Sequence, residues 1–353
     1  MSVTVQEPTV RRSDADGVHN EIPRGYSDHV REFVPMDLEA MRPKGFIKKC
    51  EDWSGSLTQK VLDGKGLKEV TACPICSSPS SDFELEKFGI AMVKCQDCTL
   101  RYSRQIPVDA AELYSDEDYL PILKKGYNEN LDYRKQRFGV ERLDLIEEQM
   151  EPGQDKSLLD IGCGTGWFLE CARERGFDIA GFDLGTEVAA WTADRLGIPV
   201  WSSSLDEIPS DRKFSAITAF DVLEHVLEPV EWLRSAMTFL KPGGMMLLYV
   251  PHFDSLSVQV MRDKSSLVTP LEHILFFTKQ AMQTLADRVG LELTYFKTRG
   301  IDMGDLMSFF EDQGDEELAR ACGKLYPYLQ PIVDGANSGN SSRYILRLNA
   351  CQV

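Results

Sequence analysis

The residues most able to do chemistry lie in one turn, where glycines alternate after a short apolar run. The run from Leu158 to Ile161 contains Asp160, and Gly162, Gly164 and Gly166 follow it. Trp167 to Arg175 has the pattern of a helix. Glycines at a strand-to-helix turn let the backbone approach a ligand and leave helix N–H groups pointing at it. A dinucleotide loop would be spaced G-x-G-x-x-G, which this turn does not follow.

We therefore expect Asp160, Gly162 and Gly164 to bind a ligand and Gly166 to serve close packing. Cys163 lies inside the loop, where a small side chain fits. We interpret it as a spacer that borders the ligand and not as a nucleophile, because no basic residue flanks it to lower its pKa.

A second acidic residue ends a second predicted strand, Asp178 to Asp183. A carboxylate in this position can accept both ribose hydroxyls of a nucleoside lying across the strand ends. The alternative is that Asp183 only caps the following helix. We expect the ribose role, with Leu184 beside it.

The elements that would position these residues continue in order along the chain. They are a short strand from Pro199 to Ser203, a strand from Phe214 to Phe220 leading into Asp221-Val222-Leu223-Glu224-His225-Val226, and a Lys241-Pro242-Gly243-Gly244 turn before a strand from Met245 to Pro251. Five such elements in this order resemble class I S-adenosylmethionine-dependent methyltransferases. The D-V-L-E-H-V and K-P-G-G elements are similar to the branch that includes ubiquinone-pathway and related small-molecule methyltransferases.

This resemblance implies an α/β fold with a Rossmann-like, seven-stranded, doubly wound sheet and S-adenosylmethionine as cofactor. It places adenine contacts at Ser204 and Leu205, and further cofactor contacts at Phe220 and Asp221, where the fourth strand ends. A helix capped by Thr278 and running to Val289, a strand from Leu291 to Thr298 and a final antiparallel strand from Ser342 to Cys351 at the sheet edge are expected to complete the fold.

Two C-x-x-C pairs lie upstream, Cys73 with Cys76 and Cys95 with Cys98. Pairs at this separation can place four thiolates around Zn²⁺, as in a zinc ribbon. A redox site would have one pair beside a βαβ pattern, and two disulfides would suit a secreted protein. We expect a structural zinc, with Phe83 to Val93 forming a hairpin in the ribbon.

The charge balance bears on what such a ribbon could bind. The chain has 39 Lys and Arg against 56 Asp and Glu, a formal net charge of −17. Leu67 to Ile106 contains as many acidic as basic residues. A nucleic-acid partner needs a basic footprint, so we expect none. No apolar run is long enough to span a membrane. The oligomeric state stays open.

Three histidines are candidates for a general base, because all three are expected on the side where open α/β sheets bind ligands, beyond the carboxyl ends of the strands. His225 follows the fourth strand, His252 the fifth, and His273 lies in Glu272-His273-Ile274-Leu275-Phe276-Phe277. Histidine titrates near neutral pH and suits this role. The alternative is that each ring only orients a loop through a hydrogen bond.

These anchors divide the chain into four parts. We expect a flexible arm at 1–40, a zinc-ribbon module at 41–106 with an irregular lead-in from Met41 to Gly66, a helical linker and substrate cap at 107–150, and a methyltransferase domain at 151–353. Within the last part, 304–340 is too long for a hairpin connection and is expected to be a helical insertion covering the active site. The segment from Cys73 to about Tyr133 resembles the N-terminal part of bacterial methyltransferases of sugar and secondary-metabolite pathways.

The sequence thus predicts a cytoplasmic enzyme that transfers a methyl group to a hydroxyl, amine or carbon of a small or carrier-linked metabolite of sugar, polysaccharide or secondary-metabolite type. Two alternatives remain: an RNA methyltransferase whose zinc ribbon recognises RNA, and a non-catalytic protein that only binds S-adenosylmethionine.

Overall fold

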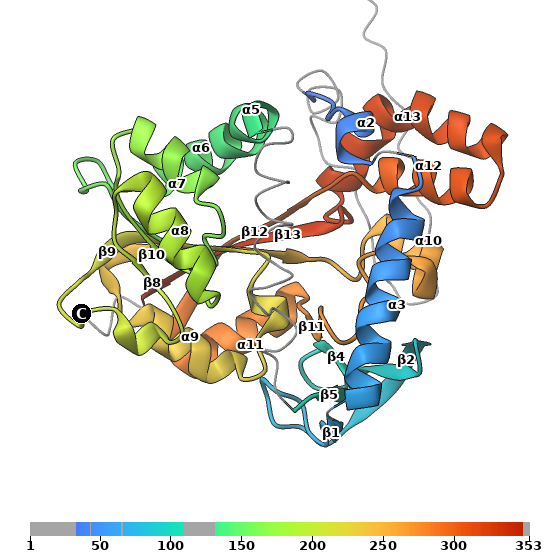
Figure 1. Ribbon diagram of the computed structural model, residues 1–353, viewed down its shortest axis with the longest axis horizontal. Coiled ribbons are helices and arrows are strands. Elements are labelled where there is room, and N and C mark those ends of the chain that lie inside the picture. Colours follow the sequence, from blue (N-terminus) through green and yellow to red (C-terminus); the bar gives the residue numbers. More distant parts are fainter. Residues whose placement is uncertain (1–32, 43, 65, 109–130, 349–353) are drawn as a thin grey trace, which may run out of the picture.

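The computed structural model describes residues 33–42, 44–64, 66–108 and 131–348 of the 353-residue chain (Figure 1). Three segments lie outside these residues. They are most of the arm predicted at 1–40, residues 109–130 of the cap predicted at 107–150, and the last five residues of the chain. A seven-stranded sheet forms the centre, in the order β12-β13-β10-β9-β6-β7-β8. Its strands are β6 (Ser157–Ile161), β7 (Asp178–Phe182), β8 (Val200–Trp201), β9 (Phe214–Phe220), β10 (Leu240–Pro251), β12 (Leu291–Arg299) and β13 (Ser341–Leu348).

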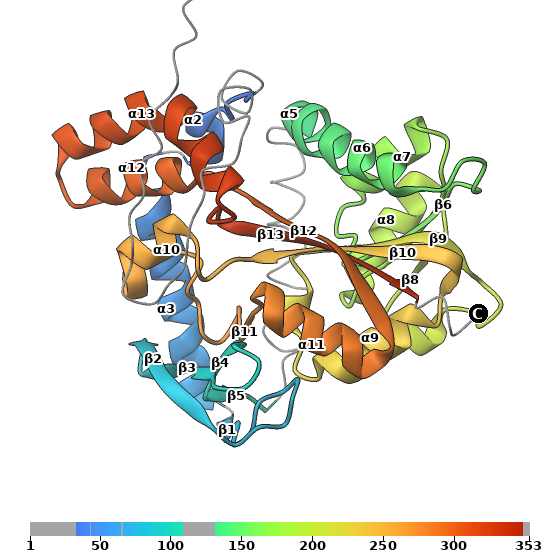
Figure 2. The same ribbon diagram turned by 180° about the vertical axis from the view of Figure 1, so that it is seen from behind.

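Helices cover both faces of this sheet, α6, α7 and α8 on one side and α9 and α11 on the other (Figures 1 and 2). All five residues of β6 are buried, as expected of a parallel strand with helices on both faces. The doubly wound sheet predicted from the sequence is confirmed. The helices of the described residues are α2 (Leu38–Met41), α3 (Phe46–Gly64), α5 (Leu131–Arg134), α6 (Val140–Gln149), α7 (Trp167–Glu174), α8 (Thr186–Leu196), α9 (Pro229–Met237), α10 (Leu256–Met261), α11 (Lys279–Val289), α12 (Asp302–Asp312) and α13 (Glu316–Gly335).

The last strand takes a different place from the one expected. We predicted it at the sheet edge, but β13 lies between β10 and β12 and pairs antiparallel with both. Tyr344, Ile345 and Leu346 are fully buried there. An edge position was therefore wrong: β12 takes the edge, and a central strand has neighbours on both sides and buries both of its faces.

The cysteine-containing segment forms a small sheet of its own, in the order β11-β4-β3-β2. Its members are β2 (Ser81–Lys87), β3 (Ile90–Cys95), β4 (Arg101–Ser103) and β11 (Leu275–Phe276), and the pair β1 (Leu67–Glu69) and β5 (Gln105–Pro107) lies beside it. β2 and β3 form the predicted hairpin. The fourth strand, β11, comes from the E-H-I-L-F-F run far along the chain, and Leu275 pairs with Tyr102.

This pairing joins the ribbon to the large sheet in one hydrophobic core. Ile75, Leu100 and Tyr102 are fully buried in the same cluster as Ile217 and Leu285 of the large sheet and its helices. The ribbon is therefore not an appendage held by a linker.

The lead-in to the ribbon is helical, so our expectation of an irregular segment was wrong. α3 runs from α12, where the Lys48 amide donates to Asp312, to the β2–β3 turn, where Gly55 meets Phe88. Its buried face includes the small polar residues Ser54 and Thr58, both below 6% exposed. Such residues hide the apolar periodicity by which an amphipathic helix is recognised.

Two helices, α12 and α13, occupy the predicted insertion. They pack against the N-terminal segment through Met36, Leu306 and Tyr326, and the hydroxyl of Tyr326 accepts from the Met36 amide at 2.8 Å. The other predicted helical segment is described only from residue 131, where α5 and α6 are joined by one π-helical turn, Lys135–Gly139. Short 3₁₀ turns lie at Leu205–Glu207, Leu223–His225 and Arg262–Lys264.

None of the helices in the described part of the chain combines the length and the apolar character that crossing a bilayer requires.

Candidate active site

The glycine loop has the geometry that its residue types predict. Gly162 has φ +75°, and a Cβ there would lie 2.4 Å from a methyl of Val222. A Cβ on Gly166, at φ +72°, would lie 2.7 Å from Thr192 and from Leu196 of α8. Gly162 thus keeps the loop close to the end of β9, and Gly166 lets α7 and α8 approach each other.

Asp183 closes this loop from the neighbouring strand. Its carboxylate accepts from the Gly164 amide at 2.8 Å and from the Gly185 amide at 3.0 Å. The side chain is buried, yet each carboxylate oxygen can accept more than one hydrogen bond. The two amides therefore fix the orientation of the Asp183 carboxylate at the edge of the sheet.

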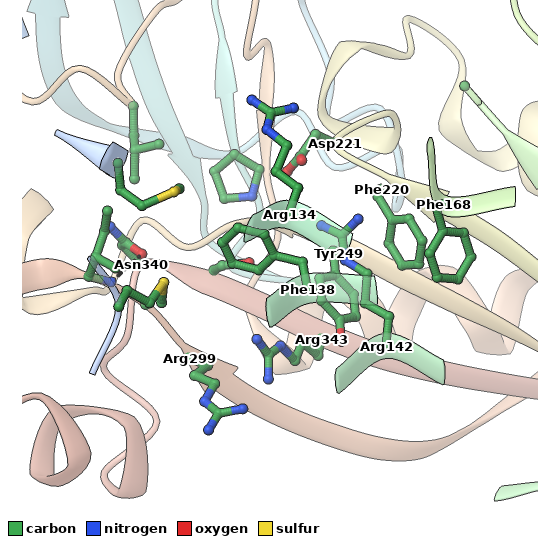
Figure 3. A pocket seen from close by; sticks show the side chains of 18 of the residues that line it. Arg134, Phe138, Arg142, Phe168, Phe220, Asp221, Tyr249, Arg299, Asn340 and Arg343 are labelled. Atoms are coloured by element: carbon green, nitrogen blue, oxygen red, sulfur yellow. Dashed lines mark hydrogen bonds between the residues drawn. The ribbon is translucent and has the colours of Figure 1, made fainter. Parts of the chain in front are cut away.

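A cavity of about 360 Å³ opens beside the loop, at the carboxyl ends of β6, β9 and β10 (Figure 3). It contains five of the predicted cofactor-binding residues: Asp160, Gly162, Cys163, Phe220 and Asp221. The other five, Gly164, Asp183, Leu184, Ser204 and Leu205, do not line it; they follow β6, β7 and β8 further along the same edge. Ser204 caps the short helix after β8 by accepting from the Asp206 amide.

The two acidic residues in the cavity are both under physical constraint. Burial raises the pKa of Asp160 to about 7, although the hydroxyl of Thr218, which donates to it at 2.6 Å, and the Arg142 charge lower it. Asp221 adopts φ +57°, a left-handed conformation that a non-glycine residue adopts only under constraint. Burial also raises the pKa of Cys163 well above its usual value, which is unfavourable for a nucleophile.

Apart from Phe220, sequence reasoning missed the basic and aromatic residues of the cavity. Arg134, Phe138 and Arg142 line it from the segment between α5 and α6, and their spacing of four residues could have indicated one helix face. The Arg142 guanidinium lies 4.0 Å from the ring centre of Phe220 and 5.1 Å from that of Tyr249. Its buried Nε has no hydrogen-bond partner in the described residues.

The three candidate histidines occupy two different places, and none lines the cavity. His252 follows the cavity residue Pro251, but it is 4% exposed and its Nδ1 lies 2.9 Å from the hydroxyl of Ser342. The rings of His225 and His273 are 5.0 Å apart. No observation tests their role as bases, which stays a prediction.

The pair of rings is held by backbone carbonyls. Nδ1 of His225 lies 2.7 Å from the Glu272 oxygen, and Nδ1 of His273 lies 2.8 Å from the Leu267 oxygen. A carbonyl only accepts, so Nδ1 carries the proton in both rings and Nε2 is the basic nitrogen. Burial and the neighbouring His273 lower the pKa of His225 to about 3.

Glu224 lies beside these rings, is fully buried and has no hydrogen-bond partner for either carboxylate oxygen in the described residues. Ligand atoms of Glu224, His225 and His273 lie within 4.8 Å of one another and could hold a cation.

The four ribbon cysteines come together as predicted. Sγ of Cys73 is 3.5 Å from Sγ of Cys98, and Sγ of Cys76 is 3.4 Å from Sγ of Cys95. All four sulfurs lie within 4.8 Å of one another. These sulfur–sulfur distances are longer than the S–S bond of a disulfide, about 2.05 Å. They suit four thiolates that each lie about 2.3 Å from one shared zinc ion.

Comparison with known proteins agrees with this geometry. Residues 127–295 match the family model of a methyltransferase domain. The matched segment contains the glycine loop and strands β6 to β10 of the large sheet.

The curated relatives that this chain matches include ubiquinone biosynthesis O-methyltransferases. That of Proteus mirabilis (strain HI4320) is 33% identical over 112 residues, 29% of this chain and 45% of the relative. That of Actinobacillus pleuropneumoniae serotype 7 (strain AP76) is 30% identical over 116 residues, 30% of this chain and 50% of the relative. The chain thus spans about half the length of these curated relatives.

Among solved structures, an S-adenosylmethionine-dependent methyltransferase from Clostridium acetobutylicum ATCC 824 matches 64% of this chain and 99% of its own, with 12% identity and a TM-score of 0.41.

The raised pKa of Asp160 predicts a pH-dependent penalty on stability. The folded protein keeps this proton up to about pH 7, whereas an unfolded chain loses it near pH 3.9. Because the folded state binds more protons between these values, the contribution of Asp160 to stability falls as pH rises through them. In ligand-free protein, Asp160→Asn should therefore gain stability relative to wild type between pH 5 and pH 8, by up to a few kcal/mol. Urea unfolding at the two pH values measures this difference, with exposed Asp178→Asn as control; equal differences at both would contradict the shifted pKa.

Proposed function

We propose that this protein is an S-adenosylmethionine-dependent methyltransferase acting on a small or carrier-linked metabolite. The observation that carries the proposal is the convergence of the glycine loop, Asp183 and the arginine-lined cavity at one edge of the sheet. An open α/β sheet binds its ligands in this crevice.

The residues present fit such a cofactor. Asp183 would hold the ribose hydroxyls, and Leu184, Ser204 and Leu205 would border the adenine. A Cβ at Gly164 would have no neighbour within 4 Å in the described residues, so the loop leaves room there for a ligand close to the backbone. The orphaned Nε of Arg142 would donate to the carboxylate of the methionine part.

The cofactor supplies an activated methyl group, so the protein needs mainly to position an acceptor and to remove its proton. The names of the relatives make a hydroxyl oxygen the first acceptor to test; amines and carbon acceptors, including sugar and secondary-metabolite types, follow. Release of S-adenosylhomocysteine with one of these acceptors would separate an enzyme from a protein that only binds the cofactor.

Asp183→Asn should weaken S-adenosylmethionine binding by about 1–3 kcal/mol, because the carboxylate is lost as an acceptor of charge-assisted hydrogen bonds. Isothermal titration calorimetry measures the affinity, and a thermal melt checks that the variant is folded. Asp178→Asn, at the exposed amino end of the same strand, is the matched control and should bind normally. Unchanged affinity in folded Asp183→Asn would remove this residue from the ribose role.

We further propose His273 as the general base, with His225 as second candidate and His252 as third. A pKa of about 3 makes His225 a weak base, and His252 lies buried against β13. His273→Gln should lower turnover by roughly 10²–10⁴-fold and leave S-adenosylhomocysteine affinity nearly unchanged. If the Gln variants of all three histidines turn over an identified acceptor normally, positioning alone drives the transfer and no histidine is the base.

We also propose that the four cysteines hold a structural zinc ion. Protein prepared without chelators should contain about one zinc per chain, and Co²⁺ in its place should give a thiolate charge-transfer spectrum. Because the ribbon shares its core with the large sheet, Cys76→Ser should lower the melting temperature of the whole domain in one transition. Cys50→Ser, a thiol outside the cluster, is the control. A metal-free wild-type protein of normal stability would contradict this proposal.

A further inference from the structure

Basic side chains gather in the cavity on the side away from the glycine loop. Arg299 ends β12 and Arg343 lies near the start of β13, and Figure 3 shows their guanidinium groups near each other, with Arg134 across the cavity. Apolar residues complete the walls: Met36, Met41, Phe138, Leu267 and Ile301. This collection stands out in a chain whose formal net charge is −17.

In the described part of the chain, three arginines beside this cavity share one carboxylate as their ion-pair partner. Glu141 pairs with Arg343 at 2.5 Å, with Arg299 at 2.9 Å and with Arg137 at 3.3 Å. Three guanidinium groups thus meet one carboxylate, and the side chains of Glu141 and Arg343 are only 15% and 12% exposed. Partly buried positive charge that is only incompletely compensated is costly, so the cluster favours an added anion.

Unsatisfied donors point to the same ligand chemistry. Nε of Arg343 and the hydroxyl of Tyr249 are buried and have no hydrogen-bond partner in the described residues. The Arg343 guanidinium lies 4.8 Å from the Tyr249 ring centre, and both side chains belong to the lining of the cavity. Buried donors in native proteins are normally paired, and arginine binds phosphate and carboxylate through two parallel hydrogen bonds.

We propose that Arg299, Arg343 and Tyr249 form a subsite for an oxyanion, a phosphate or carboxylate group carried by the methyl acceptor. This inference rests on the proposed methyltransferase function, since it assigns a substrate class to the same cavity. Glu141 holds the two arginines in place. Because its carboxylate competes with the bound anion for them, it also limits the affinity of the subsite for that anion. The apolar walls take the body of the acceptor.

The test uses full-length protein saturated with S-adenosylhomocysteine and three probes with the same ring: phenyl phosphate, benzoate and uncharged benzamide. Calorimetry at constant ionic strength should show both anions binding more tightly than benzamide. Arg343→Gln and Arg299→Gln should each weaken anion binding about tenfold and leave benzamide unaffected. The preferred anion distinguishes a phosphate-bearing from a carboxylate-bearing acceptor.

Two variants separate this role from a structural one. Glu141→Gln removes the competing carboxylate and should tighten anion binding, which loss of a merely structural ion pair would not do. Arg137→Gln, which also loses a contact with Glu141 but does not line the cavity, should change anion affinity less than the two cavity variants do.

The outcomes for cofactor and anion are distinguishable. If the anions bind no more tightly than benzamide, the subsite proposal is wrong. Binding of S-adenosylhomocysteine in the same experiment would still support the methyltransferase proposal. If Arg343→Gln instead weakens S-adenosylhomocysteine, the cluster serves the cofactor's own carboxylate and the inference is wrong. If wild type binds no S-adenosylhomocysteine, the proposed function fails, and the probes then test the subsite in its absence.

Discussion

The reversal of strand order at β6 is the constraint on which the site depends. From β6 the sheet continues through β7 and β8 on one side and through β9 and β10 on the other. The connections therefore leave in opposite directions at the carboxyl ends of β6 and β9, and a crevice opens between them. The glycine loop, Asp183 and Asp221 come from separate parts of the chain, and this one topological feature brings them to a common edge.

The antiparallel strand β13 brings arginines to the same edge of the sheet. Because β13 runs against its neighbours, its first residue, Ser341, pairs with Pro251 at the end of β10 and with Arg299 at the end of β12. A side chain near the start of β13 and one at the end of β12 thus reach the same cavity. The parallel strands contribute acidic and glycine residues, whereas β12 and β13 contribute arginines. This edge of the sheet therefore offers acidic and glycine residues to a ligand at one end of the crevice and arginines to a ligand at the other end.

What could be predicted from the sequence was local. The glycine loop, the strand ends, the hairpin between the cysteine pairs and the Thr278 cap depend on neighbouring residues, and the structure confirms them. The place of β13, the helix α3 and the pairing of β11 with β4 depend on contacts between distant segments. The cavity arginines Arg299 and Arg343 were missed for a related reason: they are far from Glu141 in the sequence, and only the fold brings both of them to this one carboxylate.

The pairing of β4 with β11 also has a consequence for how the chain is made. A ribosome releases the cysteine-rich hairpin early, but the strand that completes its sheet emerges roughly 170 residues later. During that interval Tyr102 and Leu100 lack the partners that bury them in the finished protein. Exposed apolar surface of this kind favours aggregation, so early capture of a metal ion by the four thiols would protect the nascent chain until the remainder of the sheet is synthesised.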